Sequence, residues 1–91
     1  MIEAYVLAEV RLGMAAPVAH RFEDLDQVVH ADTVTGCYDI LARVRTEAPE
    51  DLAPLVERMG AVDGVTRVLL CPVSHQAIAA HRGWQPLHAP V

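Results

Sequence analysis

The spacing of apolar residues changes along the chain in a fixed order, and that order limits the folds that the sequence can adopt. Residues 2–11 alternate as an extended strand does, and one of its sides carries Ile2, Ala4, Val6, Ala8 and Val10. After Gly13 the spacing becomes helical, with an apolar stripe made by Met14, Val18, Phe22 and Leu25. These two segments predict a strand followed by a helix. Pro17 fits the first turn of that helix, where backbone N–H groups have no partner within the helix.

A second pair of strands follows this helix. Residues 28–35 have a β-branched, strand-like composition. Gly36 then suits a tight connection, because glycine tolerates the positive φ that such turns need. Residues 40–45 alternate again, with Ile40, Ala42 and Val44 toward one side and Leu41, Arg43 and Arg45 toward the other. The segment therefore predicts a β-hairpin.

A second helix and a last strand complete the pattern. Pro49 and the acidic residues beside it are typical of a helix start. The apolar stripe of this helix is Leu52, Leu55, Val56 and Met59. Gly60 is typical of a helix end, and Asp63 with Gly64 predicts a turn before a final strand over residues 65–73.

The resulting order β-α-β-β-α-β predicts an α+β fold, a ferredoxin-like sandwich in which one sheet carries both helices on a single face. The other face stays uncovered, and the alternation places Tyr5 and Leu7 on it. One apolar set of the last strand joins them, either Val65, Leu69, Cys71 and Val73 or Val68 and Leu70. Exposed apolar surface of this kind usually marks an interface, so we expect a homodimer formed through this face.

Length and charge narrow the classes of function. A chain of 91 residues has room for one hydrophobic core, and its hydrophobic content of 53% again favours self-association. Seven basic against 12 acidic residues give a net charge of −5, and the arginines are dispersed, so we expect no direct binding of nucleic acid. The chain lacks a signal-peptide pattern and an apolar stretch of ~20 residues, which predicts a cytoplasmic protein without a membrane segment. The isolated Cys37 and Cys71 indicate reduced thiols.

Two short motifs resemble those of one family. The run Val34-Thr35-Gly36-Cys37-Tyr38-Asp39-Ile40-Leu41 resembles the hairpin of the effector-binding (RAM) domain of the Lrp/AsnC transcription regulators. The run Val62-Asp63-Gly64-Val65-Thr66-Arg67 resembles the start of their last strand. The resemblance covers residues 2–75. It implies an Lrp/AsnC-type ligand-binding domain over residues 1–75 and a C-terminal tail over residues 76–91.

The family resemblance also implies how such a protein works. It implies ferredoxin-like sheets that pair into a dimeric α/β barrel, dimers that assemble into an octamer (a tetramer of dimers), and a small, amino-acid-like effector bound where dimers meet. Full-length members carry an N-terminal winged helix-turn-helix, whereas here the first strand follows Met1 at once, so we expect a stand-alone form. Such a module would act in transcription regulation through a partner, for example a full-length Lrp/AsnC regulator, rather than on DNA itself.

The candidate ligand-binding residues are Thr35, Gly36, Tyr38, Asp39, Val68 and Leu70. In one interpretation the four hairpin residues form a pocket, with turn N–H groups on a carboxylate and Asp39 on an ammonium. In the other they are ordinary hairpin residues, which permit the turn and satisfy local backbone groups. Val68 and Leu70 stand where relatives often have threonines. Val68 and Leu70 would make one wall of the predicted site apolar, which favours a hydrophobic effector or no effector.

No set of residues in the sequence predicts catalysis, a metal ion or a cofactor. The five histidines lack the spacing of a metal site, and His30 with Asp32, which share a strand face, have no nucleophile beside them in sequence. The alternative is a small enzyme of the dimeric α/β-barrel type, such as a monooxygenase, because those enzymes share this strand order. A cavity inside the protomer with converging titratable groups would favour the enzyme, and a cavity between dimers would favour the effector module.

Two further features bear on the family and on the tail. An ACT-type regulatory domain shares the strand order, but its Asp-x-Pro-Gly motif is missing at Arg11-Leu12-Gly13-Met14. Trp84, the single tryptophan, lies in the tail. It predicts that the tail docks onto a neighbouring subunit or a partner, and the alternative is a tail without fixed structure.

Overall fold

A computed structural model describes residues 1–73 of the chain. In order along the chain, its elements are β1 (Ile2–Val10), α1 (Ala15–Glu23), β2 (Val28–Thr33), β3 (Ile40–Thr46), the short 3₁₀ helix η1 (Pro49–Asp51), α2 (Leu52–Gly60) and β4 (Val65–Pro72). The predicted order β-α-β-β-α-β is confirmed. The domain boundary predicted near residue 75 and the tail with Trp84 lie outside the described residues.

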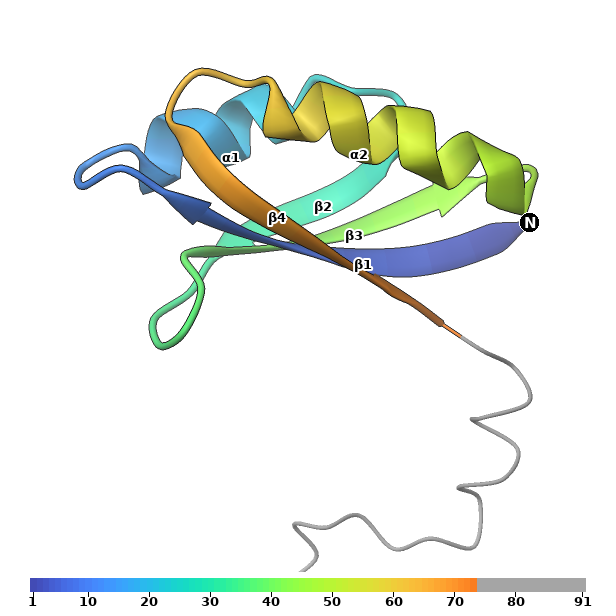
Figure 1. The fold of residues 1–91 in the computed structure, drawn as a ribbon, viewed down its shortest axis with the longest axis horizontal. Helices are drawn as coiled ribbons and strands as arrows, with labels where there is room; N and C mark the ends of the chain where they lie inside the picture. The colour runs from blue at the N-terminus through green and yellow to red at the C-terminus, as the bar shows by residue number, and fades with distance from the viewer. Residues whose placement is uncertain (74–91) are drawn as a thin grey trace, which may run out of the picture.

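The four strands form one antiparallel sheet in the order β2-β3-β1-β4, and both helices lie on the same face of it (Figure 1). This is the predicted ferredoxin-like arrangement. In β1, Tyr5 is paired with Arg43 of β3 on one side and with Cys71 of β4 on the other. Directly opposed residues of an antiparallel sheet share a face, so this register decides which side chains become neighbours.

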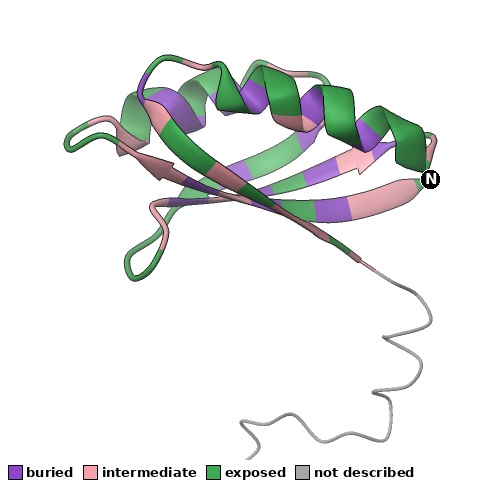
Figure 2. Ribbon diagram, in the orientation of Figure 1, coloured by how far each residue is buried: buried purple, intermediate pink, exposed green. Residues whose placement is uncertain are grey.

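The hydrophobic core lies between the sheet and the two helices. On the sheet side it contains the residues that the alternation predicted, all fully buried: Ala4, Val6, Ala8, Ile40, Ala42 and Val44. The helices contribute Val18, Phe22, Leu52, Leu55 and Met59. Alanine side chains are small, so those on the sheet let the helices pack closely, while the outer sides of both helices stay exposed (Figure 2).

A β-bulge changes the side on which one predicted residue lies. The register of β1 against β4 shifts between Glu9 and Val10, so that Val10 is opposite Val65 and both pack against the core. The sequence pattern grouped Val65 with Leu69 and Cys71. This assignment of Val65 was wrong, because the bulge adds one residue to β4 and turns Val65 toward the helices.

The sheet face without helices has an apolar centre. Leu7 is opposite Leu41 of β3 and Leu69 of β4, and Tyr5 is opposite Cys71. Leu69 is 45% exposed and Tyr5 is 39% exposed, because no helix covers this side. We name this side of the sheet the open face.

The connection between β2 and β3 is longer than the tight turn that the sequence predicts. Residues 34–39 form a loop that extends past the sheet, on the side away from the helices (Figure 1). A hydrogen bond of 2.9 Å from the N–H of Val34 to the carbonyl of Asp39 closes its base. Gly36 has a φ of +125°, which confirms the predicted need for glycine in this connection.

Candidate functional site

Asp39 joins the β2–β3 loop to the neighbouring strand β1. Its backbone N–H donates to the carbonyl of Ala8 at 2.9 Å, and its Oδ2 accepts a hydrogen bond from the backbone N–H of Val10, also at 2.9 Å. Val10 lies beyond the last pair of β1 with β3, which is Ala8 with Ile40, so its backbone N–H has no strand acceptor on that side. The carboxylate of Asp39 therefore fixes the base of the loop, and one of its oxygens is engaged.

Tyr38 is held by a side chain that the sequence did not single out. Arg67 of β4 donates to the Tyr38 hydroxyl at 3.1 Å, and its guanidinium carbon lies 5.3 Å from the centre of the Tyr38 ring. The same guanidinium donates to Oε2 of Glu9 at 3.2 Å. Glu9 and Arg67 are opposed in the register of β1 against β4, and without that register no sequence signal connects them to the loop.

Thr35 and Gly36 lie at the exposed tip of the same loop. A Cβ added to Gly36 would meet no heavy atom of residues 1–73 within 4 Å, so the backbone there faces open space beside this part of the chain. Glycine permits another molecule to approach the main chain closely. The loop thus combines a fixed base with an accessible tip.

Val68 and Leu70 lie on the other side of the sheet. Val68 is opposite Ala8 and Leu70 is opposite Val6, and both are half-buried against the core. The loop extends on the side away from the helices, so a single protomer does not bring the six predicted residues together (Figure 1). Within one protomer, the neighbour of the loop is Arg67 instead.

A hollow of about 280 Å³ lies on the open face, and its lining residues are Tyr5, His30, Asp32, Leu41 and Arg43. His30 and Asp32 share a strand face, as predicted, and His30 Nε2 lies 2.7 Å from Asp32 Oδ1. The other ring nitrogen of His30, Nδ1, lies 3.3 Å from Oε2 of Glu23. Both ring nitrogens of His30 therefore lie beside carboxylates, and the side chain is 60% exposed.

Glu3 connects two arginines on the open face. Arg43 donates to its Oε1 at 3.2 Å, and Arg45 donates to its Oε2 at 3.2 Å. The hydrogen bond from Arg43 is the main reason why the pKa of Glu3 lies below its ordinary value, and the positive charges of both arginines lower the pKa further. This end of the open face is therefore polar and internally paired.

The sequence profile described as the Lrp/AsnC ligand binding domain matches residues 3–80, which is most of the chain. The chain belongs to the Lrp/AsnC ligand binding domain family. It is similar to the HTH-type transcriptional regulator FL11 of Pyrococcus furiosus, with 30% identity over 64 residues, which are 70% of this chain and 42% of that regulator. The regulator of the same name from Pyrococcus abyssi is 29% identical over 62 residues, 68% of this chain and 41% of the regulator. The Lrp/AsnC domain spans less than half the length of these relatives.

Solved structures share the fold of this Lrp/AsnC domain. TTHA0845 from Thermus thermophilus has a TM-score of 0.77 and 31% identity, over 81% of this chain and 94% of the other. FFRP-DM1 has a TM-score of 0.76 and 21% identity, over 81% of this chain and 100% of the other. AsnC of E. coli has a TM-score of 0.71 and 19% identity, over 79% of this chain and 50% of AsnC. The predicted ferredoxin-like fold is thereby confirmed.

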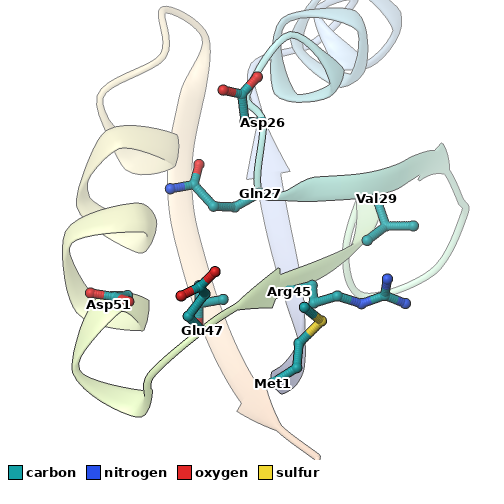
Figure 3. A pocket seen from close by; sticks show the side chains of 8 residues that line it. Met1, Asp26, Gln27, Val29, Arg45, Glu47 and Asp51 are labelled. Atoms are coloured by element: carbon teal, nitrogen blue, oxygen red, sulfur yellow. The ribbon is translucent and has the colours of Figure 1, made fainter.

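The Lrp/AsnC domain has a second hollow, of about 390 Å³, beside β3 (Figure 3). Its lining residues are Met1, Asp26, Gln27, Val29, Arg45, Thr46, Glu47 and Asp51. Three of them are carboxylates, and Nε of Arg45 is buried without a hydrogen-bond partner among the described residues. Their order in the sequence carries no recognisable motif, so this hollow could not be predicted.

Residues 1–73 hold no group of side chains suited to a metal ion. No three His, Cys, Asp or Glu side chains in this part of the chain are grouped closely enough to hold one. Cys37 is exposed, Cys71 is partly buried, and both thiols are free. Neither α1 nor α2, the α-helices of these residues, is long and apolar enough to cross a membrane.

Proposed function

We propose that this Lrp/AsnC domain is a non-catalytic module that binds a small effector and forms oligomers, and that it takes part in transcription regulation without binding DNA directly. The names of its relatives as transcriptional regulators support the regulatory role. The observation that carries the proposal is the β2–β3 loop, because Asp39 fixes its base while the tip at Gly36 faces open space. A held loop with accessible backbone is suited to recognise a polar ligand.

The proposed effector site lies between dimers, with a loop from one dimer and an apolar wall from the next. Its residues are Thr35, Gly36, Tyr38, Asp39, Val68 and Leu70. The positions of the loop and the wall on opposite sides of the sheet support this division. Loop N–H groups bind a carboxylate, the second oxygen of Asp39 binds an ammonium, and the wall contacts an apolar side chain. A hydrophobic or aromatic amino acid fits this combination better than serine or asparagine.

A thermal-shift screen of the amino acids tests this proposal. A ligand at a hundred times its Kd stabilises the folded domain by about 2.7 kcal/mol, which is easily measured for a domain of this size. Asp39→Asn keeps an oxygen for the Val10 N–H but loses the negative charge, so it should abolish the shift caused by ligand. Asp39→Ala also removes the acceptor, and should in addition lower the stability of the free domain by about 1 kcal/mol.

Two results would contradict the effector site. If Asp39→Asn responds to ligand as the parent protein does, Asp39 has a structural role alone. If no amino acid shifts the parent protein, the domain is not an amino-acid sensor.

The proposal also excludes direct, sequence-specific binding to DNA. The net charge of −5 repels the phosphate backbone. Fluorescence anisotropy with duplex DNA at low salt should therefore show no tight binding that depends on sequence, and such binding would contradict the proposal. Regulation then runs through a partner, and mixed oligomers with a full-length Lrp/AsnC regulator should be visible by native mass spectrometry.

A catalytic function has less support. The hollow on the open face holds titratable groups within one protomer, as an enzyme requires. However, the two ring nitrogens of His30 lie beside the carboxylates of Asp32 and Glu23. The residues that line this hollow include no serine, threonine, cysteine or lysine that could act as a nucleophile.

A further inference from the structure

The hollow on the open face is built by the strand register, and it lies apart from the residues of the proposed effector site. Tyr5, Arg43 and His30 are opposed across β1, β3 and β2 and form one row, and Leu41 and Asp32 are opposed in the next row. All five line the same space of about 280 Å³. This volume is just below the ~300–1,000 Å³ range of small-molecule pockets, so it suits only a compact ligand.

The hollow offers charges of both signs that keep hydrogen-bonding capacity. Arg43 uses Nη2 for the carboxylate of Glu3, and a guanidinium has five N–H donors, so further donors remain. Asp32 uses Oδ1 for His30, and its other carboxylate oxygen has no hydrogen-bond partner among residues 1–73. One side of the hollow can therefore bind an anion and another side a cation.

The strand register places the two charged residues on neighbouring strands of the same face. Asp32 is opposite Leu41, so Arg43 is its diagonal neighbour on β3, and diagonal neighbours have Cα atoms roughly 7–8 Å apart. Leu41 is half-buried, and with the ring of Tyr5 it provides apolar surface beside the charges.

We propose that this hollow is a second small-molecule site, which takes a compact zwitterion with an apolar side chain. Arg43 binds the carboxylate of the ligand, Asp32 binds its ammonium, and Leu41 and Tyr5 contact its side chain. Pairing of two open faces would cover the hollow and exclude water, which strengthens charge-assisted hydrogen bonds. The site goes beyond the proposed loop site and does not depend on it.

Isothermal titration calorimetry of the full chain with three related probes tests the ligand class. Phenylalanine carries both charges, 3-phenylpropanoate lacks the ammonium, and phenethylamine lacks the carboxylate. Because each charge makes a charge-assisted hydrogen bond, phenylalanine should bind about ten-fold more tightly than either analogue. Equal affinities for all three probes, or no binding of phenylalanine, would overturn the proposal.

Matched variants locate the binding. Arg43→Gln should weaken phenylalanine about ten-fold and leave phenethylamine unchanged, because it removes the partner of the carboxylate alone. Asp32→Asn should weaken phenylalanine by a similar factor and leave 3-phenylpropanoate unchanged. Arg45→Gln is the control, because Arg45 also donates to Glu3 but does not line this hollow, and it should change none of the three affinities. Circular dichroism verifies that each variant is folded.

The variant Asp39→Asn, in the β2–β3 loop, distinguishes binding at this hollow from binding at the proposed effector site. If Asp39→Asn loses phenylalanine binding while Arg43→Gln and Asp32→Asn keep it, the ligand binds at the loop, and the open-face proposal is wrong while the proposed function stands. If Arg43→Gln and Asp32→Asn lose binding while Asp39→Asn keeps it, the open-face site is supported.

Discussion

Gly64 shows how the conformation of a single residue is tied to the packing of a helix. It is buried in the turn before β4, has a φ of +102°, and its carbonyl accepts a hydrogen bond of 2.8 Å from the N–H of Arg11. A Cβ at this position would lie 2.8 Å from Cε of Met14 and 3.1 Å from Cγ2 of Val18. Glycine is therefore required at this position for two reasons: its backbone conformation and the close approach of α1.

Gly64→Ala should lower the free energy of unfolding by about 2 kcal/mol or more, because left-handed strain adds to the displacement of Met14 and Val18. Gly13→Ala is the matched control. Gly13 also has a positive φ, of +82°, but a Cβ there meets no atom of the described residues within 4 Å, so the variant should lose about 1 kcal/mol. Urea denaturation measures both values, and equal losses would show that the contact with α1 is unimportant.

Glu3 makes the stability of the domain depend on pH at the acid end. Its pKa is lower in the folded chain than its ordinary value of 4.5, mainly through the hydrogen bond from Arg43. As the pH falls, the carboxylate of Glu3 is therefore protonated in the unfolded chain before it is protonated in the folded chain. The stability that Glu3 contributes is fully present above pH 4.5, and it is lost as the pH falls through the pKa of the folded state. Thermal unfolding of the parent and of Glu3→Gln should differ at pH 7 and converge in acid. A difference that grows on acidification would contradict this assignment.

At the scale of elements, α2 is held to the sheet by one side. Leu52, Leu55 and Met59 are buried and recur at helical spacing, while Glu57 and Arg58 between them are exposed. Its start is preceded by η1, where the carboxylate of Asp51 accepts a hydrogen bond of 3.3 Å from the N–H of Ala48. Because the helix is short, most of its stability comes from the burial of this apolar stripe.

Met59→Ala should cost about 2–5 kcal/mol, because it leaves a cavity at a fully buried position between α2 and the sheet. Glu57→Ala removes an exposed side chain from the same helix and should change the free energy of unfolding by less than about 0.5 kcal/mol. Denaturation in urea compares the two variants with the parent. Similar losses for both would mean that α2 does not pack as described.

At the scale of the whole molecule, the open face decides how the chain associates. Its apolar centre is formed by Tyr5, Leu7, Leu41, Leu69 and Cys71, and charged pairs such as Glu9–Arg67 and Glu3–Arg43 flank it. An apolar centre with a polar surround is the arrangement of many protein interfaces. The sequence prediction of a homodimer through this face follows the same physical argument, and the octamer rests on the family resemblance.

Light scattering after gel filtration should show a dimer or a larger oligomer at micromolar concentration. Leu69→Asp should shift the protein toward the monomer, because it puts a charge into the apolar centre of the open face. Leu12→Asp is the control, since Leu12 is fully exposed in the β1–α1 loop and should leave the oligomer unchanged. A monomeric parent, or dissociation caused by Leu12→Asp as well, would contradict an interface on the open face.

The local spacing of apolar residues was sufficient to predict the helices and strands and the buried side of most of them. Strand alternation and helical stripes depend on residues two to four positions apart, so Val6, Ile40, Phe22 and Met59 could be assigned to the core without knowing the fold. The family motif around Gly36 and Asp39 could be recognised for the same reason, because it is continuous in the chain.

The contacts that build the loop and the hollow depend on pairing between segments far apart in the chain. Local spacing contains no information on that pairing. The carboxylate of Asp39 binds the N–H of Val10, 29 residues away, and Arg67 binds Glu9, 58 residues away. A bulge of one residue turned Val65 toward the helices, and the register of three strands brought Tyr5, Arg43 and His30 into one hollow. Register is set by the summed packing of the whole sheet, so the site had to be read from the tertiary structure.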